Sequence, residues 1–184
     1  MSSIIYRCDG SDVPLYQLEM LQAGQCPHLI QASVQHVDDH IIVCPNISGL
    51  FHPKTFLAVD GLQTRMKNLS HGLHPEVLKW LRLVAEGVAA LEDHLVEESQ
   101  VSYKLDDLYI DLCANQVKAV LAQSGKTLID GLCDLSLEIY AIRPESHADV
   151  IAKKLMAHHA ERILGCRQLL ALLSSWESEY RNGH

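Results

Sequence analysis

The clearest periodic signal in the chain is a stripe of apolar residues that begins after Pro75. Its members recur every three or four residues, with charged residues between them, which is the spacing of one face of an α-helix. Pro75 suits the first helical turn, where its missing N–H needs no partner. We therefore predict a long core-facing helix from Pro75 to about Val96, whose apolar face comprises Val77, Leu81, Val84, Val88, Leu91 and Leu95.

Two further helices are predicted in the C-terminal part of the chain. Thr127-Leu128-Ile129-Asp130 resembles a capping box and predicts a helix from Thr127 to about Tyr140, before a break at Pro144. A last long helix is expected from His147 to Ser178. Its face would comprise Ile151, Leu155, His159, Ile163, Cys166, Leu170 and Leu173.

The first 50 residues favour strands. Residues 3–8 are β-prone, and two β-branched runs, 29–37 and 40–44, flank Asp38-Asp39, which predicts an antiparallel hairpin. Between these strands we expect a short helix over 16–22. Gly24 would end it, and Leu15, Leu18 and Leu21 would form its apolar face.

The middle of the chain predicts a second hairpin. Residues 108–113 pair naturally with 117–121 across a turn in which Asn115 can adopt a left-handed conformation. A short strand is expected over 101–105, and 45–74 is irregular with a short helix within 55–69.

This order of elements predicts an α+β fold with two lobes. The small β-rich lobe spans residues 1–50. The mainly helical lobe spans 51–180 and contains the hairpin near 108–121, and residues 181–184 form a frayed polar tail.

Composition narrows the class of protein. The chain has 184 residues, 48% of them hydrophobic, so a core can form and disorder is not expected. A net charge of −8 argues against a nucleic-acid partner, because such binding depends on Lys and Arg neutralising phosphates. No apolar run is long enough to insert into a bilayer, and no secretory signal begins the sequence. The six cysteines are scattered without a Cys-x-x-Cys pair, so we expect a cytoplasmic protein with reduced thiols.

The sharpest chemical motif is Gly125-Lys126-Thr127, which matches the end of a phosphate-binding P-loop. The full pattern requires a glycine where this chain has Val120, and fewer than 60 residues follow for the rest of such a domain. A turn followed by a helix cap accounts for the same residues. Cofactor binding at these three residues therefore stays an alternative.

Other catalytic patterns are missing from the sequence. The chain has eleven histidines but no His-Glu-x-x-His motif, and neighbours such as His158 and His159 diverge on a helix. No Gly-x-Ser-x-Gly motif or activated cysteine is recognisable. We expect no catalytic residues, no metal site and no cofactor.

Four segments, taken together, resemble a bacterial domain of unknown function found upstream of forkhead-associated (FHA) domains in Gram-positive proteins. That domain is in turn similar to the kinase-like pseudokinase domain of the type VII secretion component EssB/YukC. The segments are residues 16–21, 27–34, 88–95 and 105–112. The resemblance implies a truncated, two-lobed protein-kinase-like fold: a small antiparallel β lobe with one helix, and a larger helical lobe with a β-hairpin.

The resemblance also implies that the kinase chemistry has been lost. Ser102, Tyr103 and Lys104 would stand where a kinase has His-Arg-Asp, and Tyr109 where it has the Mg²⁺-binding Asn. Gln123-Ser124-Gly125 would replace Asp-Phe-Gly. Without these carboxylates, phosphoryl transfer loses its metal and most of its electrostatic assistance.

Three functions follow as hypotheses. The first is a non-catalytic pseudokinase-like module that contacts another protein in bacterial signalling or secretion-associated assembly. The alternative is a nucleotide-binding phosphohydrolase that uses Gly125, Lys126 and Thr127. A homo-oligomeric helical scaffold, built on the apolar stripes of the two long helices, is the third.

Overall fold

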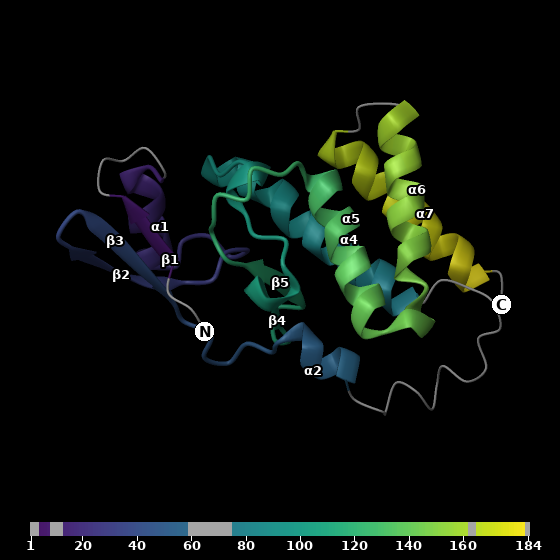
Figure 1. Ribbon diagram of the computed structural model, residues 1–184, viewed down its shortest axis with the longest axis horizontal. Helices are drawn as coiled ribbons and strands as arrows, with labels where there is room; N and C mark the ends of the chain where they lie inside the picture. The colour runs from purple at the N-terminus through teal and green to yellow at the C-terminus, as the bar shows by residue number, and fades with distance from the viewer. Residues whose placement is uncertain (1–3, 8–12, 59–74, 162–164, 183–184) are drawn as a thin grey trace.

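The computed structural model describes residues 4–7, 13–58, 75–161 and 165–182, and its architecture is mixed α+β (Figure 1). A small sheet with one helix lies at one end, a two-stranded hairpin lies in the middle, and four helices lie at the other end. The α+β class expected from the order of elements is therefore confirmed.

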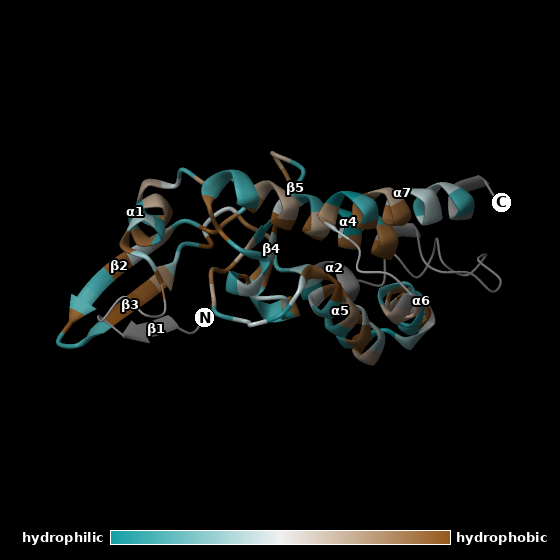
Figure 2. Ribbon diagram, turned by 90° about the horizontal axis from the view of Figure 1, so that it is seen from above, coloured by the Kyte–Doolittle hydropathy of each residue, from teal (hydrophilic) through white to brown (hydrophobic). Residues whose placement is uncertain are grey.

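The N-terminal sheet has three antiparallel strands in the order β1-β3-β2: β1 (Ile4–Arg7), β2 (Ala32–Val37) and β3 (His40–Pro45). The predicted hairpin is confirmed. Val37 pairs with His40, and Asp38 has a φ of 51°, the left-handed conformation that this tight turn needs. Figure 2 shows β3, the central strand, as more hydrophobic than β2, which lies at the sheet edge.

Helix α1 (Leu15–Ala23) confirms the predicted short helix, and Gly24 ends it with a φ of 64°. The predicted face is wrong at Leu15, which is 63% exposed. The side chains that α1 buries are Gln17, Leu18, Met20 and Leu21. Gln17 is buried because it hydrogen-bonds other elements, a contact that hydrophobic periodicity does not register.

The second predicted hairpin is also confirmed, with β4 (Leu108–Asp111), β5 (Gln116–Ala119) and Asn115 at a φ of 52°. Leu29 forms a parallel bridge to Ala119, which joins the segment before β2 to this hairpin. The strand expected over 101–105 is wrong. Short 3-10 helices, η2 (Glu98–Gln100) and η3 (Leu105–Asp107), flank it, and Val101 makes only an isolated bridge to Leu121.

Helix α4 (Pro75–Ala90) ends earlier than predicted. It continues as a 3-10 turn, η1 (Leu91–His94), and Leu95 then reverses the chain with a φ of 55°. Five of the six predicted stripe residues are buried, whereas Leu95 is 73% exposed. Before α4, α2 (Pro53–Ala58) begins earlier than the short helix expected within 55–69, and residues 59–74 lie outside the described part.

Helix α5 (Leu128–Ile142) begins at its predicted cap, and Pro144 opens the short turn η4 (Pro144–Ser146). The single helix predicted over 147–178 is wrong, because the structure has two: α6 (Ala148–Glu161) and α7 (Cys166–Asn182). One helix of that length would be about 48 Å long and could not pack along both of its neighbours. Instead α6 lies against α5 and α7 lies against α4.

The break changes which residues of the last two helices are buried. Ile151, Leu155 and Leu173 are buried as predicted, but His159 is exposed and Leu169 is more buried than Leu170. Ile163 lies outside the described residues. Helix α7 also continues through Asn182, into the segment expected to be frayed.

One continuous core joins these elements. Its buried apolar side chains come from α1, the sheet, α4, the hairpin and α5 to α7. Arg82 of α4 donates to Glu177 of α7 at 2.8 Å, and the Glu177 side chain is only 8% exposed. Among the described helices, none combines the length and apolarity needed to cross a bilayer.

Candidate phosphate-binding and kinase-like sites

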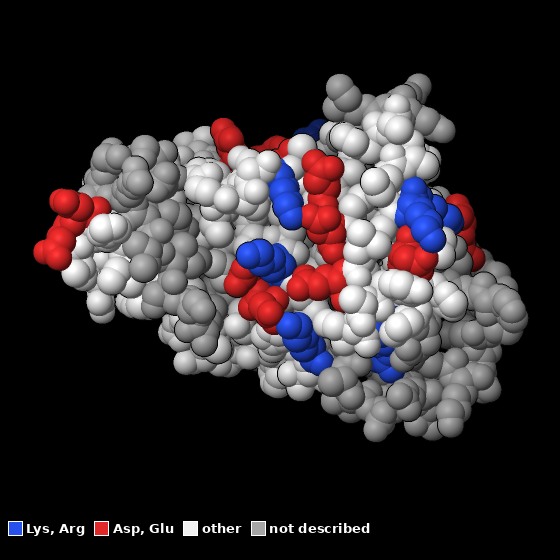
Figure 3. All heavy atoms as spheres, viewed as in Figure 1, with Lys and Arg blue, Asp and Glu red and all other residues white. Residues whose placement is uncertain are grey.

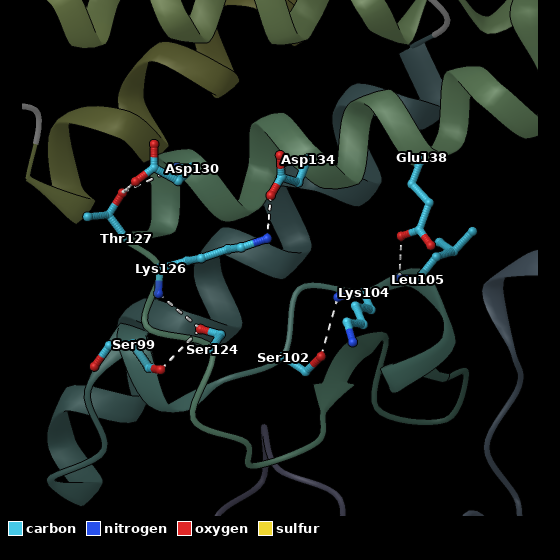
Figure 4. A network of polar contacts seen from close by, with 10 residues as sticks. All are labelled: Ser99, Ser102, Lys104, Leu105, Ser124, Lys126, Thr127, Asp130, Asp134 and Glu138. Atoms are coloured by element: carbon cyan, nitrogen blue, oxygen red, sulfur yellow. Dashed lines mark hydrogen bonds and ion pairs between the residues drawn. The ribbon is translucent and has the colours of Figure 1, made fainter. Parts of the chain in front are cut away.

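Most of the residues singled out by the sequence lie on two loops at one face of α5. The loops around 98–107 and 122–127 both contact this helix, and Figure 4 shows ten residues of the region with the polar contacts between them. On this face Lys and Arg side chains alternate with Asp and Glu, rather than forming a basic patch (Figure 3).

The P-loop-like triplet makes contacts within the protein at each position. Gly125 has a φ of 66° and its N–H donates to the Ser99 carbonyl at 2.9 Å. Lys126 Nζ forms an ion pair with Asp134 of α5. Thr127 caps the helix: its Oγ1 accepts the Asp130 N–H at 3.2 Å and donates to the Asp130 carboxylate at 2.7 Å. The expected turn and helix cap are therefore confirmed.

An acidic side chain already occupies the N-terminus of α5. Leu128 N–H donates to Glu98 Oε2 at 2.9 Å, so a carboxylate sits where the helix dipole favours an anion. Two hydrogen bonds fix the neighbouring loop: Ser124 Oγ donates to Ser99 O at 3.0 Å, and Ala122 N–H to Gln100 O at 2.8 Å. The protein's own carboxylate thus fills the position that a phosphate would take.

Two of the three residues that the resemblance would place at the kinase His-Arg-Asp motif have structural contacts. Ser102 is buried, and its hydroxyl donates to Asp107 at 2.6 Å. Tyr103 is buried against α5 and its hydroxyl donates to the Glu98 carbonyl at 3.0 Å. Burial, together with the charges of Glu98 and Cys166, raises the pKa of Tyr103 far above its ordinary value, so it stays a phenol. Lys104 is exposed.

Tyr109, which the resemblance would place at the kinase metal-binding Asn, packs edge-on against His52. Their ring centroids are 5.3 Å apart at an interplanar angle of 87°, and Tyr109 is buried. His52 Nδ1 accepts the Lys54 N–H at 3.1 Å, while its Nε2 lies 3.4 Å from Asp106. The hydrogen bond and ion pair with Lys54 lower the pKa of Asp106, which therefore stays a carboxylate.

A further carboxylate holds the same loop from α5. Glu138 accepts the Leu105 N–H at 2.7 Å, at the point where η3 begins (Figure 4). Together, Glu98 and Glu138 attach the loop of residues 98–105 to α5, one at each end of the loop. These hydrogen bonds can hold the loop in place against α5. The carboxylates of Glu98 and Glu138 are engaged in them.

Sequence reasoning missed both glutamates. One signal was available: Glu97 and Gln100 form a capping box around η2, a pattern of acid and amide three residues apart that locates this turn. The long-range contacts of Glu98 and Glu138 have no local signature. The partner of Glu98, Leu128, follows it by 30 residues, and the partner of Glu138, Leu105, precedes it by 33 residues.

The described residues contain no group of three His, Cys, Asp or Glu side chains that could hold a metal ion. His158 instead lies near Trp176, with ring centroids 5.8 Å apart, and Lys154 lies 5.3 Å from the same ring centroid. Cys133 is buried, which raises the pKa of its thiol to about 11 and suppresses its reactivity.

No family model matches the chain, and no curated protein matches it either. The contacts described above are therefore the basis on which a function can be proposed.

Proposed function

We propose that this chain is a non-catalytic module with a truncated, two-lobed protein-kinase-like fold, and that it acts through contact with another protein. The α+β architecture, with a small sheet at one end and helices at the other, is compatible with this arrangement. In this proposal the module serves bacterial signalling or a secretion-associated assembly in the cytoplasm.

One observation carries the non-catalytic part of the proposal. The groups that would hold a phosphate are engaged by the protein itself: Leu128 N–H donates to Glu98, and Lys126 pairs with Asp134. A nucleotide would have to displace the Glu98 carboxylate from the helix N-terminus and compete with Asp134 for the lysine. Both exchanges oppose binding, because each replaces a contact that is already made within the protein.

The rival function is a nucleotide-binding phosphohydrolase that uses Gly125, Lys126 and Thr127. The left-handed Gly125 and the position of the triplet before a helix are features that it shares with a P-loop. In this rival, Lys126 would leave Asp134 to contact a phosphate, and Mg²⁺ would strengthen binding.

Calorimetric titration with ATP and GTP, with and without Mg²⁺, tests the proposal. We expect no heat of binding from the wild-type chain or from its Lys126→Ala variant. Lys104→Ala is the matched control, because it removes an exposed lysine outside the triplet. Mg²⁺-dependent binding at micromolar nucleotide that disappears in Lys126→Ala and persists in Lys104→Ala would establish the rival instead.

A further inference from the structure

An exposed leucine with a left-handed backbone lies where α4 and η1 end. Leu95 has a φ of 55° and is 73% exposed. A side chain with a β-carbon is disfavoured in this conformation, and helix ends of this kind usually carry glycine. Its N–H donates to the Glu92 carbonyl at 3.0 Å, and the next N–H, from Val96, to Leu91 at 3.1 Å. Backbone conformation alone thus favours glycine here, and most of the leucine's own surface stays exposed.

The protein holds this leucine in a fixed position beside α1. The Leu95 carbonyl accepts the Tyr16 hydroxyl at 2.7 Å and Gln17 Nε2 at 2.9 Å. Gln17 is buried and also donates to Gln100 Oε1 at 3.0 Å. The end of α4 lies next to α1 in both Figure 1 and Figure 2. Two hydrogen bonds therefore hold the turn against α1, and a third joins α1 to η2.

Helix α1 adds exposed apolar area next to this turn. Leu15 is 63% exposed and Tyr16 is 44% exposed, although both belong to a helix whose other face is buried in the core. We call Leu15, Tyr16 and Leu95 the Leu95 surface. Single exposed leucines are ordinary, but here Leu95 lies in a strained turn, and hydrogen bonds hold that turn to the helix that carries Leu15 and Tyr16.

The charged side chains of the two segments that carry this surface, residues 13–25 and 91–101, are acidic. Glu19, Glu92, Asp93 and Glu97 are exposed, and neither residues 13–25 nor residues 91–101 contain a Lys or an Arg. Lys126 follows the glycine bonded to Ser99, but its ammonium group is directed to Asp134. The segments that carry the Leu95 surface are therefore acidic, with no basic residue of their own.

We propose that the Leu95 surface docks a segment of a partner protein in which apolar side chains are flanked by lysines or arginines. The apolar side chains would cover Leu95, Leu15 and Tyr16, and the basic residues would face the four exposed carboxylates. Apolar contact at the centre supplies most of the affinity, while charges at the rim speed association and select the partner. This inference rests on the proposed function, since it names the partner class of a protein-contact module.

Fluorescence anisotropy with the labelled peptide Lys-Lys-Leu-Phe-Leu-Lys-Lys tests the inference. The full chain should bind this peptide, and Leu95→Gly should weaken binding about tenfold or more, equivalent to the loss of one central contact. Leu112→Ala is the control, because it truncates a 52% exposed leucine of the β4–β5 hairpin, outside the Leu95 surface, and should leave binding unchanged. A Glu-flanked peptide should not bind, and added salt should weaken the Lys-flanked complex.

The Leu95→Gly variant has a further readout, because glycine removes the backbone strain. Its melting temperature should be equal to or higher than that of the wild type, so lost binding cannot be ascribed to unfolding. Equal binding by Leu95→Gly and the wild type, or no binding by the wild type, would overturn the inference. A dimer of the wild type that Leu95→Gly dissociates in sedimentation would also overturn it, since the occupant would be a second copy. None of these outcomes decides the non-catalytic proposal, which depends on the nucleotide titration.

Discussion

The ring of Tyr103 lies directly against the backbone of Gly131, so that a β-carbon added at position 131 would overlap the ring atoms. Gly131 is in the first turns of α5, and Tyr103 is in the extended segment between η2 and η3. The ring cannot move away easily, because it is 3% exposed and its hydroxyl is bonded to Glu98. This contact sets how closely the loop of residues 98–105 approaches α5.

The first prediction concerns this contact. Gly131→Ala should lower the free energy of unfolding by about 2 kcal/mol, because overpacking a full site outweighs the smaller gain in helix propensity. Urea denaturation measures the loss. In a Tyr103→Ala background the same substitution should instead stabilise the protein by about 1 kcal/mol, since the ring is gone. A loss of equal size in both backgrounds would show that Tyr103 is not the obstacle.

The second prediction separates the buried stripe of α4 from its exposed end. Leu81 is fully buried, so Leu81→Ala should leave a cavity and cost about 2–5 kcal/mol of stability. Leu95→Ala makes the same chemical change at an exposed site and should alter stability by no more than about 0.5 kcal/mol. Thermal denaturation of both variants checks this contrast. Equal melting temperatures would contradict the assignment of the helix face.

The third prediction tests the structural role of Thr127. Thr127→Ala removes the side-chain oxygen that accepts the Asp130 N–H and should destabilise the fold by about 1 kcal/mol. Thr127→Ser keeps the oxygen and should retain most of the stability. Chemical denaturation compares the two variants. If serine were as damaging as alanine, the cap would not be the reason for this residue.

The fourth prediction is a dependence of stability on pH. Burial lowers the pKa of His28, and His94 and Lys118 act in the same direction, whereas a hydrogen bond to Val117 and the charge of Glu86 oppose them. Among the described residues, the buried His28 Nδ1 has no hydrogen-bond partner, so a proton there would be poorly solvated. The unfolded chain therefore binds this proton more tightly. The free energy of unfolding should fall as pH drops below about 6.5, the unfolded value of the pKa.

Urea midpoints between neutral pH and about pH 5 measure this dependence. His28→Asn should flatten the slope because it removes the titrating group. His36→Asn, at an exposed position of β2, is the control and should leave the slope as it is in the wild type. An unchanged slope in His28→Asn would assign the pH dependence to other groups.

The local features of this fold can be read from the sequence. The turns at Asp38 and Asn115, the cap at Thr127 and the break at Pro144 lie where the pattern placed them. Each depends on the conformational preference or hydrogen bonding of residues within a few positions of one another. Such preferences act over short stretches and can be read without knowledge of the rest of the chain.

The ends of the long helices and the contacts of the charged side chains depend on how distant segments pack. Periodicity identifies the apolar face of a helix, but α7 begins at Cys166 because the chain must turn back to pack against α4. Glu98 has no local signature, yet it accepts the Leu128 N–H at the start of α5, and Lys126 pairs with Asp134 on that helix. Leu95 was predicted to lie on the apolar stripe, but it is exposed. The buried Gln17 donates a hydrogen bond to its carbonyl. The same cause applies in each case. A contact between distant segments depends on how the chain brings them together in space, and the residues next to either partner do not predict this.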